Sequence, residues 1–159
     1  MNLLKTLIFT VVVPATITIY VPLWLVLPPR AFVHTDAAHI VGLLPIIFGA
    51  CVYFWCAWDF ATHGRGTPAP IDPPKELVAR GLYRHVRNPM YVGVASILFG
   101  ESLLFASVAL LWYAVAVVVG FNLFVLLYEE PTLRRKFGAS YERYCGTVPR
   151  WLPRLRVND

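Results

Sequence analysis

Apolar residues dominate this chain in long runs that few polar positions interrupt. No charged residue lies within 6–29 or within 37–58, and Glu101 is the one charged residue in 88–128. A helix that crosses the hydrocarbon core of a bilayer needs about 20 apolar residues. The first two runs are each long enough for one such helix, and the third run is long enough for two. The pattern predicts an all-α integral membrane protein with about four transmembrane helices, at residues 6–28, 38–60, 89–105 and 108–128.

The runs also carry helix breakers and small residues. The third run needs a reversal, which we expect around Glu101 to Ser107; the alternative is one long span with a re-entrant piece. In the first run, Pro14 and Pro22 each remove a backbone donor, so we expect a kinked helix whose neighbours compensate for the lost bonds. The second run has three residues that permit close contact with another helix, namely Gly42, Pro45 and Gly49.

Two polar segments accompany these runs. Residues 61–88 open with a sequence too rich in Pro and Gly for helix or sheet, which predicts a cytoplasmic loop. After the fourth run, apolar side chains recur at offsets of four, four and three residues, at Leu133, Phe137, Tyr141 and Tyr144. This spacing predicts a cytoplasmic amphipathic helix within the C-terminal segment 130–159. Such a helix either lies on anionic lipid headgroups or covers a site as a lid.

Composition and charge exclude several classes of protein. Hydrophobic residues make up 58% of the chain and charged residues 14%, too few to cover a soluble domain of this length. A Rossmann domain needs a Gly-rich strand-to-helix turn, which this chain lacks. The three cysteines have neither disulfide-framework nor zinc spacing, so we expect no metal site.

The basic residues predict how the chain sits in the membrane. The formal net charge is +5, and every Lys and Arg except Arg30 falls in segments that four spans place on one side. This positive-inside pattern predicts that both termini are cytoplasmic. It also predicts that the basic residues flank membrane spans rather than bind nucleic acid. We expect a single multi-pass domain over residues 1–159, in the inner or plasma membrane of a prokaryote. Membrane lipids are therefore expected partners.

The densest polar cluster is residues 81–93, where the loop enters the third span. Pro89 suits a first helical turn, and Asn88 before it suits an N-cap, so local structure explains both residues. Arg87 serves equally well as a membrane anchor.

A second cluster is the adjacent pair Glu129 and Glu130, at the cytoplasmic end of the fourth span. The helix dipole disfavours acids at that end. Arg134, four residues on, is a local partner for Glu130, whereas Glu129 has none and suits a cationic ligand. Paired acids and aromatic rings at one membrane depth suit S-adenosylmethionine, because a carboxylate binds its ammonium and Tyr its sulfonium.

Three motifs resemble a known family. They are G-L-Y-R-H-V-R-N-P-M-Y-V-G, then Y-E-E-P-T-L-R-R-K-F-G-x-x-Y-x-x-Y, then V-P-R-W-L-P. In this order, with a hydrophobic hairpin between the first two, they resemble the integral-membrane methyltransferases that include isoprenylcysteine carboxyl methyltransferase and the phospholipid methyltransferases. The resemblance covers roughly residues 64–153. It implies methyl transfer from S-adenosylmethionine to a lipid or prenylated acceptor, with the cofactor enclosed by the loop, the end of the last span and the C-terminal segment.

The resemblance also assigns site residues. It places cofactor binding at Lys75, Glu76, Leu77, Val78, Tyr83, Asn88, Pro89, Met90, Tyr91 and Glu129. The catalytic candidates are Arg87, Tyr91 and Glu130. Asn88 stands where the family has His, and an amide can donate a hydrogen bond but cannot titrate. Isoprenylcysteine enzymes carry an Arg one turn before the Glu pair, where this chain has Phe-Val-Leu at 124–126. This difference weakens isoprenylcysteine as the acceptor and leaves Arg87 as a substitute substrate clamp.

Two further polar residues of the predicted spans, Glu101 and Asn122, are candidates for a specific role. Intramembrane acids often mark ion or proton pathways, so the alternative function is a small four-helix transporter that uses Glu101. A transporter requires Glu101 and no adenosyl cofactor, whereas the enzyme requires Glu129. Asn122 is the one strongly polar side chain of the fourth span, and we expect it to form an interhelical hydrogen bond.

Overall fold

The computed structural model describes residues 12–26, 37–63 and 80–153. Every regular element in these ranges is helical, which confirms the all-α prediction for the described residues. The first helix covers Val12–Val26 and includes the π-helical turn η1. The elements are η1 (Thr16–Tyr20), α2 (Val21–Val26), α3 (Ala37–Ile40), α4 (Leu43–His63), η2 (Gly81–Arg84), α5 (Pro89–Leu104), α6 (Val108–Phe124), η3 (Val125–Glu129), α7 (Glu130–Phe137) and α8 (Ala139–Thr147).

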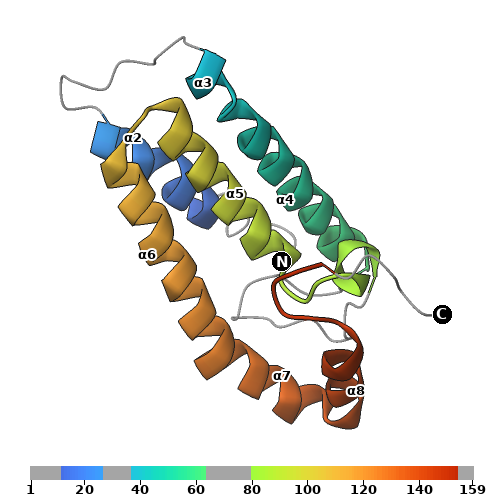
Figure 1. Cartoon of the computed structure of the whole chain (residues 1–159). Coiled ribbons are helices and arrows are strands. Elements are labelled where there is room, and N and C mark those ends of the chain that lie inside the picture. The colour runs from blue at the N-terminus through green and yellow to red at the C-terminus, as the bar shows by residue number, and fades with distance from the viewer. Residues whose placement is uncertain (1–11, 27–36, 64–79, 154–159) are drawn as a thin grey trace.

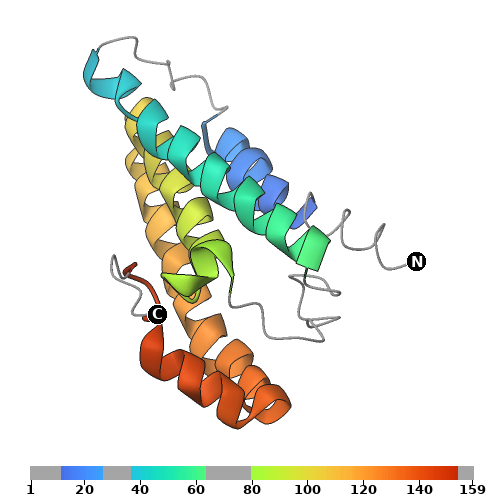
Figure 2. The same ribbon diagram turned by 90° about the vertical axis from the view of Figure 1, so that its right-hand side faces the viewer.

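Helix α5 is the centre of the bundle, because it packs against α4, α6, α3 and η1. Figure 1 shows α5 between α4 and α6, and α6 diverging from α5 as it runs toward α7. Helix α8 then turns back beneath the first turn of α5. In both Figure 1 and Figure 2, the chain that follows α8 returns toward the loop before α5. The beginning of α5 and the end of α6 therefore face a common region, which α8 and the chain after it border.

One helix meets the length and composition of a membrane span. It runs without a break over Val108–Phe137, because α6, η3 and α7 are continuous. Three other apolar helices are shorter, at Val12–Val26, Leu43–Asp59 and Pro89–Leu104. The count of four spans therefore remains a prediction. Large apolar side chains are nevertheless exposed on three of these helices, as Trp24, Trp58 and Trp112 show with exposed fractions of 74%, 70% and 68%. Soluble monomers rarely expose so much apolar surface.

Helix boundaries agree with the sequence prediction at the hairpin and differ after the fourth run. Helix α5 ends at Leu104, and α6 begins after Ser107, whose hydroxyl accepts a hydrogen bond from the amide of Leu110. The hairpin is therefore two helices and a tight turn. The single amphipathic helix predicted across 133–144 is wrong, because Gly138, with φ +51°, separates α7 from α8. Glycine adopts this left-handed conformation without the steric strain that a Cβ causes.

A neighbouring helix compensates for the backbone donor that is missing at Pro22. In the π-helical register of η1, a backbone N–H bonds the carbonyl five residues back, as Val21 bonds Thr16. Pro22 has no N–H, so the carbonyl of Ile17 loses this partner. The hydroxyl of Tyr113, on α6, donates a hydrogen bond to that carbonyl at 3.0 Å. A neighbouring helix therefore satisfies the group that the proline frees, as expected inside a membrane.

Glycines hold α4 and α5 together at backbone contact. A Cβ built on Gly49 would lie 2.3 Å from the carbonyl oxygen of Gly93, and one on Gly42 would lie 2.6 Å from that of Gly100. The two pairs are one heptad apart on each helix, so the contact repeats every two turns. The prediction that Gly42 and Gly49 permit close helix contact is confirmed.

We expect Gly49→Ala to destabilise the protein by about 1–3 kcal/mol, because the new methyl group meets backbone that must move. Gly120→Ala is the matched control, since nothing lies within 4 Å of a Cβ at Gly120 in helix α6. Thermal unfolding of both variants in detergent measures the difference. Equal melting temperatures for the two variants would contradict the close contact.

Candidate functional site

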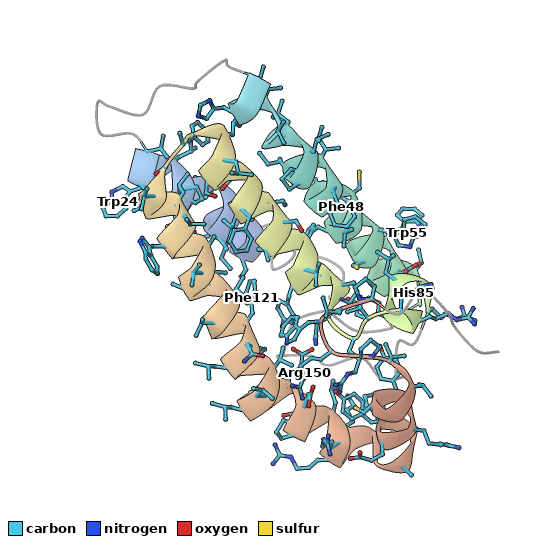
Figure 3. The ribbon with its side chains drawn as sticks, viewed as in Figure 1. Trp24, Phe48, Trp55, His85, Phe121 and Arg150 are labelled. Carbon is cyan, nitrogen blue, oxygen red and sulfur yellow. The ribbon has the colours of Figure 1, made fainter. Side chains whose placement is uncertain are left out.

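The first turn of α5 meets the end of η3 at a hydrogen-bonded pair. The hydroxyl of Tyr91 donates to Oε2 of Glu129 at 2.9 Å. The ring of Tyr91 also lies 4.7 Å, centroid to centroid, from the ring of Phe121 on α6. Figure 3 shows Phe121 at the level where α6 begins to diverge from α5. The rings of Tyr91 and Phe121, which we call the aromatic floor, therefore lie beside the carboxylate of Glu129.

Glu129 is half-buried at this position. Among the residues that the structure describes, none with a positive charge lies within ion-pair distance of its carboxylate. A carboxylate that loses water contacts is stabilised by a cation or by hydrogen bonds, and the phenol of Tyr91 supplies one such bond. The remaining hydrogen-bonding capacity of Glu129 suits a cationic group on a ligand.

Glu130, the adjacent residue, has a different environment. It is 5% exposed, and Arg150 donates to it from Nε at 2.6 Å and from Nη2 at 3.0 Å. Arg87 Nη1 lies 3.1 Å from the same carboxylate. Burial raises the pKa of Glu130, but hydrogen bonds from Arg150 and the charges of both arginines outweigh it, so the pKa lies below its ordinary value. Glu130 is therefore a poor proton acceptor.

The partner expected for Glu130 from helical spacing is wrong. Arg134 instead pairs with Glu142 of α8 at 2.8 Å, and both of these side chains are about half exposed. The separation of α7 from α8 at Gly138 brings Glu142 within reach of Arg134. Glu130 takes its hydrogen bonds from residues distant in sequence, which helical periodicity cannot indicate.

Residues 148–153, which we call the C-terminal strap, are fixed to the loop before α5. The amide of Arg87 donates to the carbonyl of Pro149 at 2.9 Å, and Asn88 Nδ2 donates to the carbonyl of Arg150 at 3.1 Å. Asn88 does precede α5, but its side chain makes no cap hydrogen bond, so the N-cap explanation for this amide is wrong. The side-chain amide of Asn88 instead binds the C-terminal strap. Figure 3 shows Arg150 between α7 and the beginning of α5.

The strap also contacts α6. Trp151 Nε1 donates to Oδ1 of Asn122 at 3.1 Å. Asn122 was expected to bond another spanning helix, and this expectation is wrong for the described contacts. Arg87 Nη1 also donates to Sγ of Cys145 at 2.8 Å, which joins the loop before α5 to α8.

Of the other predicted cofactor-binding residues, Tyr83, Pro89 and Met90 lie in described parts of the bundle, and four do not. Tyr83 is buried in η2, where its carbonyl accepts a 2.7 Å hydrogen bond from the hydroxyl of Tyr144. Pro89 is fully buried at the start of α5, as predicted for a first turn, and Met90 packs against the bundle core. The four positions Lys75, Glu76, Leu77 and Val78 lie outside the described residues.

Helix α8 covers the loop before α5. Tyr141 is 3% exposed, and Tyr144 reaches the carbonyl of Tyr83. The basic side chains of α7 and α8 remain exposed. Both interpretations of the C-terminal amphipathic segment, the lid and the helix on lipid headgroups, remain predictions.

Sequence reasoning missed four residues that shape the site. Cys56 is fully buried in α4 and shares a side-chain hydrogen bond with Tyr83. Arg150, Trp151 and Cys145 hold the strap and the loop. The V-P-R-W sequence marked the strap as part of a motif, but no spacing rule indicates where its side chains bind.

The ion pairs of Glu130 predict acid sensitivity. A carboxyl whose pKa is lower in the folded state stabilises the protein above its unfolded pKa. That stabilisation is lost as the pH falls below about 4.5 and passes through the folded pKa. We expect the melting temperature of the wild type to fall more steeply over this range than that of Glu130→Gln. Parallel curves for the two proteins would contradict the assignment.

Comparison with known proteins places this chain in a family. The sequence model of the phospholipid methyltransferase family matches residues 37–140, about two thirds of the chain. Neither the curated proteins nor the solved structures gave a significant match. The matched range includes α5, α6 and the Glu129–Glu130 pair. The chain therefore belongs to the phospholipid methyltransferase family, as the sequence resemblance implied.

Proposed function

We propose that this member of the phospholipid methyltransferase family transfers a methyl group from S-adenosylmethionine to a lipid-like acceptor in the membrane. Membership makes the chain a membrane-associated methyltransferase and gives no support to a transporter that uses Glu101. The observation that carries the proposal is the contact between Tyr91 and Glu129. The carboxylate of Glu129 lies beside the rings of Tyr91 and Phe121, and no described cation lies within ion-pair distance of it.

The residues present fit the cofactor. Its ammonium suits the carboxylate of Glu129, which no described cation neutralises. Its sulfonium suits the faces of Tyr91 and Phe121, because aromatic rings attract cations. Tyr83 borders the same region from η2, and burial, the largest cause, raises the pKa of its phenol, so Tyr83 remains neutral. The resemblance also assigns residues 75–78 to cofactor binding, and these lie outside the described residues.

When bound, S-adenosylmethionine supplies a methyl group whose carbon–sulfur bond breaks as a nucleophile forms the new bond, leaving a neutral thioether. Catalysis then depends on orientation and exclusion of water rather than on protonation of the leaving group. In this proposal Glu129 and Tyr91 orient the cofactor. Helix α8 and the C-terminal strap exclude water from it. An anionic acceptor needs no base, whereas an amine acceptor must release one proton.

Arg87 and Glu130 have positioning roles in this proposal. Both residues were catalytic candidates, and Arg87 was also a candidate substrate clamp. Their charges instead neutralise one another, together with Arg150, at distances of 2.6–3.1 Å. A carboxylate held by two guanidinium groups fixes the strap and the loop in place, and it has little affinity for a proton.

The membrane arrangement that we propose has four spans and cytoplasmic termini. It places the basic loop before α5 and the charged helices α7 and α8 at one face of the bilayer, in agreement with the distribution of basic residues. Cysteine labels at Thr35 and at the C-terminus should react from opposite sides of sealed vesicles. Reaction of both labels from the same side would contradict this topology.

Changes at Tyr91 separate its ring from its hydroxyl. We expect Tyr91→Phe to weaken cofactor binding less than Tyr91→Ala does, because phenylalanine keeps the ring against Phe121 and loses only the bond to Glu129. The lost hydrogen bond to a charged group corresponds to at most about 3 kcal/mol. Calorimetry with S-adenosylhomocysteine measures both affinities. A larger loss for phenylalanine than for alanine would contradict the aromatic floor.

The activity itself is tested with labelled methyl donor in native membranes that contain the chain. Extraction and identification of the labelled product should yield a methylated lipid-like molecule. Glu101→Gln should form the same product at a similar rate, whereas Glu129→Gln should form much less. Product formation that depends on Glu101 and not on Glu129 would overturn the proposal.

A further inference from the structure

The C-terminal strap reaches deeper into the bundle than the site that it borders. Asn122 lies seven residues before Glu129 in the unbroken helix Val108–Phe137. At about 1.5 Å per residue, this separation is about 10 Å along the helix, toward the bilayer interior. Trp151 donates its N–H to Asn122 at this depth. A residue that follows the last helix therefore inserts its indole beside a predicted span, on the membrane side of Glu129.

Two features connect this contact with the bilayer. Leu152, the next residue of the strap, is 80% exposed, which suits an apolar side chain in contact with lipid. Phe121, adjacent to Asn122, forms the aromatic floor with Tyr91. The contact between Trp151 and Asn122 therefore adjoins the aromatic floor, and the residue that follows Trp151 is exposed.

The two sides of the strap have different anchors. On the cytoplasmic side, Arg150 binds Glu130 through two charge-assisted bonds, and two backbone carbonyls of the strap accept from Arg87 and Asn88. On the membrane side, one neutral bond joins Trp151 to Asn122. Bonds between charged groups are roughly twice as strong as neutral ones. The strap can therefore open at Trp151 while its cytoplasmic end stays fixed.

We propose that Trp151 and Asn122 form the latch of a lateral gate, through which the membrane acceptor reaches the site at Glu129 and Tyr91. The inference rests on the proposed function. The cofactor is charged and arrives from water, whereas a lipid-like acceptor arrives from the bilayer, which is the side of the latch. When Trp151 withdraws, Oδ1 of Asn122 is released, and it accepts a hydrogen bond from an N–H or O–H group of the acceptor.

Reversible cross-linking tests the latch. The double variant Asn122→Cys, Trp151→Cys is reconstituted as the full chain in vesicles of lipids extracted from native membranes. It is then treated with a short bis-methanethiosulfonate reagent. We expect a loss of at least about tenfold in labelled product, with the affinity for S-adenosylhomocysteine unchanged and with activity restored by a thiol reductant. Each single cysteine variant, treated in the same way, controls for reaction at Cys51, Cys56 and Cys145.

A second variant keeps the inference falsifiable if the cysteine pair does not fold. Trp151→Phe preserves the ring and removes the donor, and one neutral hydrogen bond corresponds to about fivefold in an equilibrium constant. We expect kcat/KM for the membrane acceptor to rise about fivefold while cofactor affinity stays the same. A purely structural role would lower cofactor affinity and activity together.

The outcomes separate the two proposals. Full activity of the cross-linked protein would overturn the gate and leave the methyltransferase function standing. Cross-linking that abolishes cofactor binding would place the strap on the path of the cofactor instead, which also overturns the gate. A folded wild type with neither cofactor binding nor methyl transfer would remove the proposed function, and the gate with it.

Discussion

Replacing Glu130 with glutamine is expected to destabilise the protein by about 3 kcal/mol, the lower end of the range for breaking a buried ion pair. Arg87, whose side chain is 11% exposed, would lose its counter-charge without gaining water. Arg150 is about one third exposed and can hydrate, which limits the loss. Thermal unfolding in detergent measures the effect. The strap should also become more accessible to protease in this variant.

The matched control is the other ion pair of the C-terminal region. Glu142→Gln removes the partner of Arg134, but both side chains are about half exposed, so we expect less than about 1 kcal/mol. Equal destabilisation by the two substitutions would mean that Glu130 contributes no more than a surface charge. The role of Glu130 in fastening the strap would then be wrong.

Replacing Glu129 with glutamine is expected to leave the protein folded and to weaken cofactor binding. Glutamine keeps an oxygen that accepts from the hydroxyl of Tyr91, so the contact between α5 and η3 survives. The cofactor ammonium loses its counter-charge, which corresponds to about 1.5–3 kcal/mol, or about 10- to 150-fold in the dissociation constant. Calorimetric titration with S-adenosylhomocysteine, which keeps the ammonium, measures this change.

Glu101→Gln is the control for a general effect of removing an acid from the bundle. Glu101 lies in the last turn of α5, at the opposite end of the helix from Tyr91. Its replacement should leave cofactor affinity unchanged. Unchanged affinity in Glu129→Gln, with both proteins folded, would exclude the proposed cofactor site.

Sequence patterns predicted the helices because hydrophobic runs and helix breakers act locally. The start of α5 at Pro89, the hairpin before Ser107 and the backbone donor missing at Pro22 all follow from local backbone chemistry. Motif resemblance brought Tyr91 and Glu129 together as site residues, and the structure joins them by a hydrogen bond. Their roles in cofactor binding remain predictions.

The division of labour between Glu129 and Glu130 could not be predicted in the same way. Adjacent side chains on a helix point about 100° apart, and here Glu129 ends the π-helical turn η3 whereas Glu130 begins α7. The counter-charge of Glu130 comes from Arg150, twenty residues later, and the partner of Asn122 comes from the same strap. Contacts between distant segments depend on how the strap folds back, which neither helical spacing nor charge pattern specifies.

The most direct measurement is equilibrium binding of labelled S-adenosylmethionine to the purified wild-type chain in lipid nanodiscs. A methyltransferase with the site at Glu129 and Tyr91 should show saturable binding that unlabelled S-adenosylhomocysteine displaces and that Glu129→Gln weakens at least about tenfold. A folded chain that binds no S-adenosylmethionine, or that binds it equally well with glutamine at this position, would contradict the central claim.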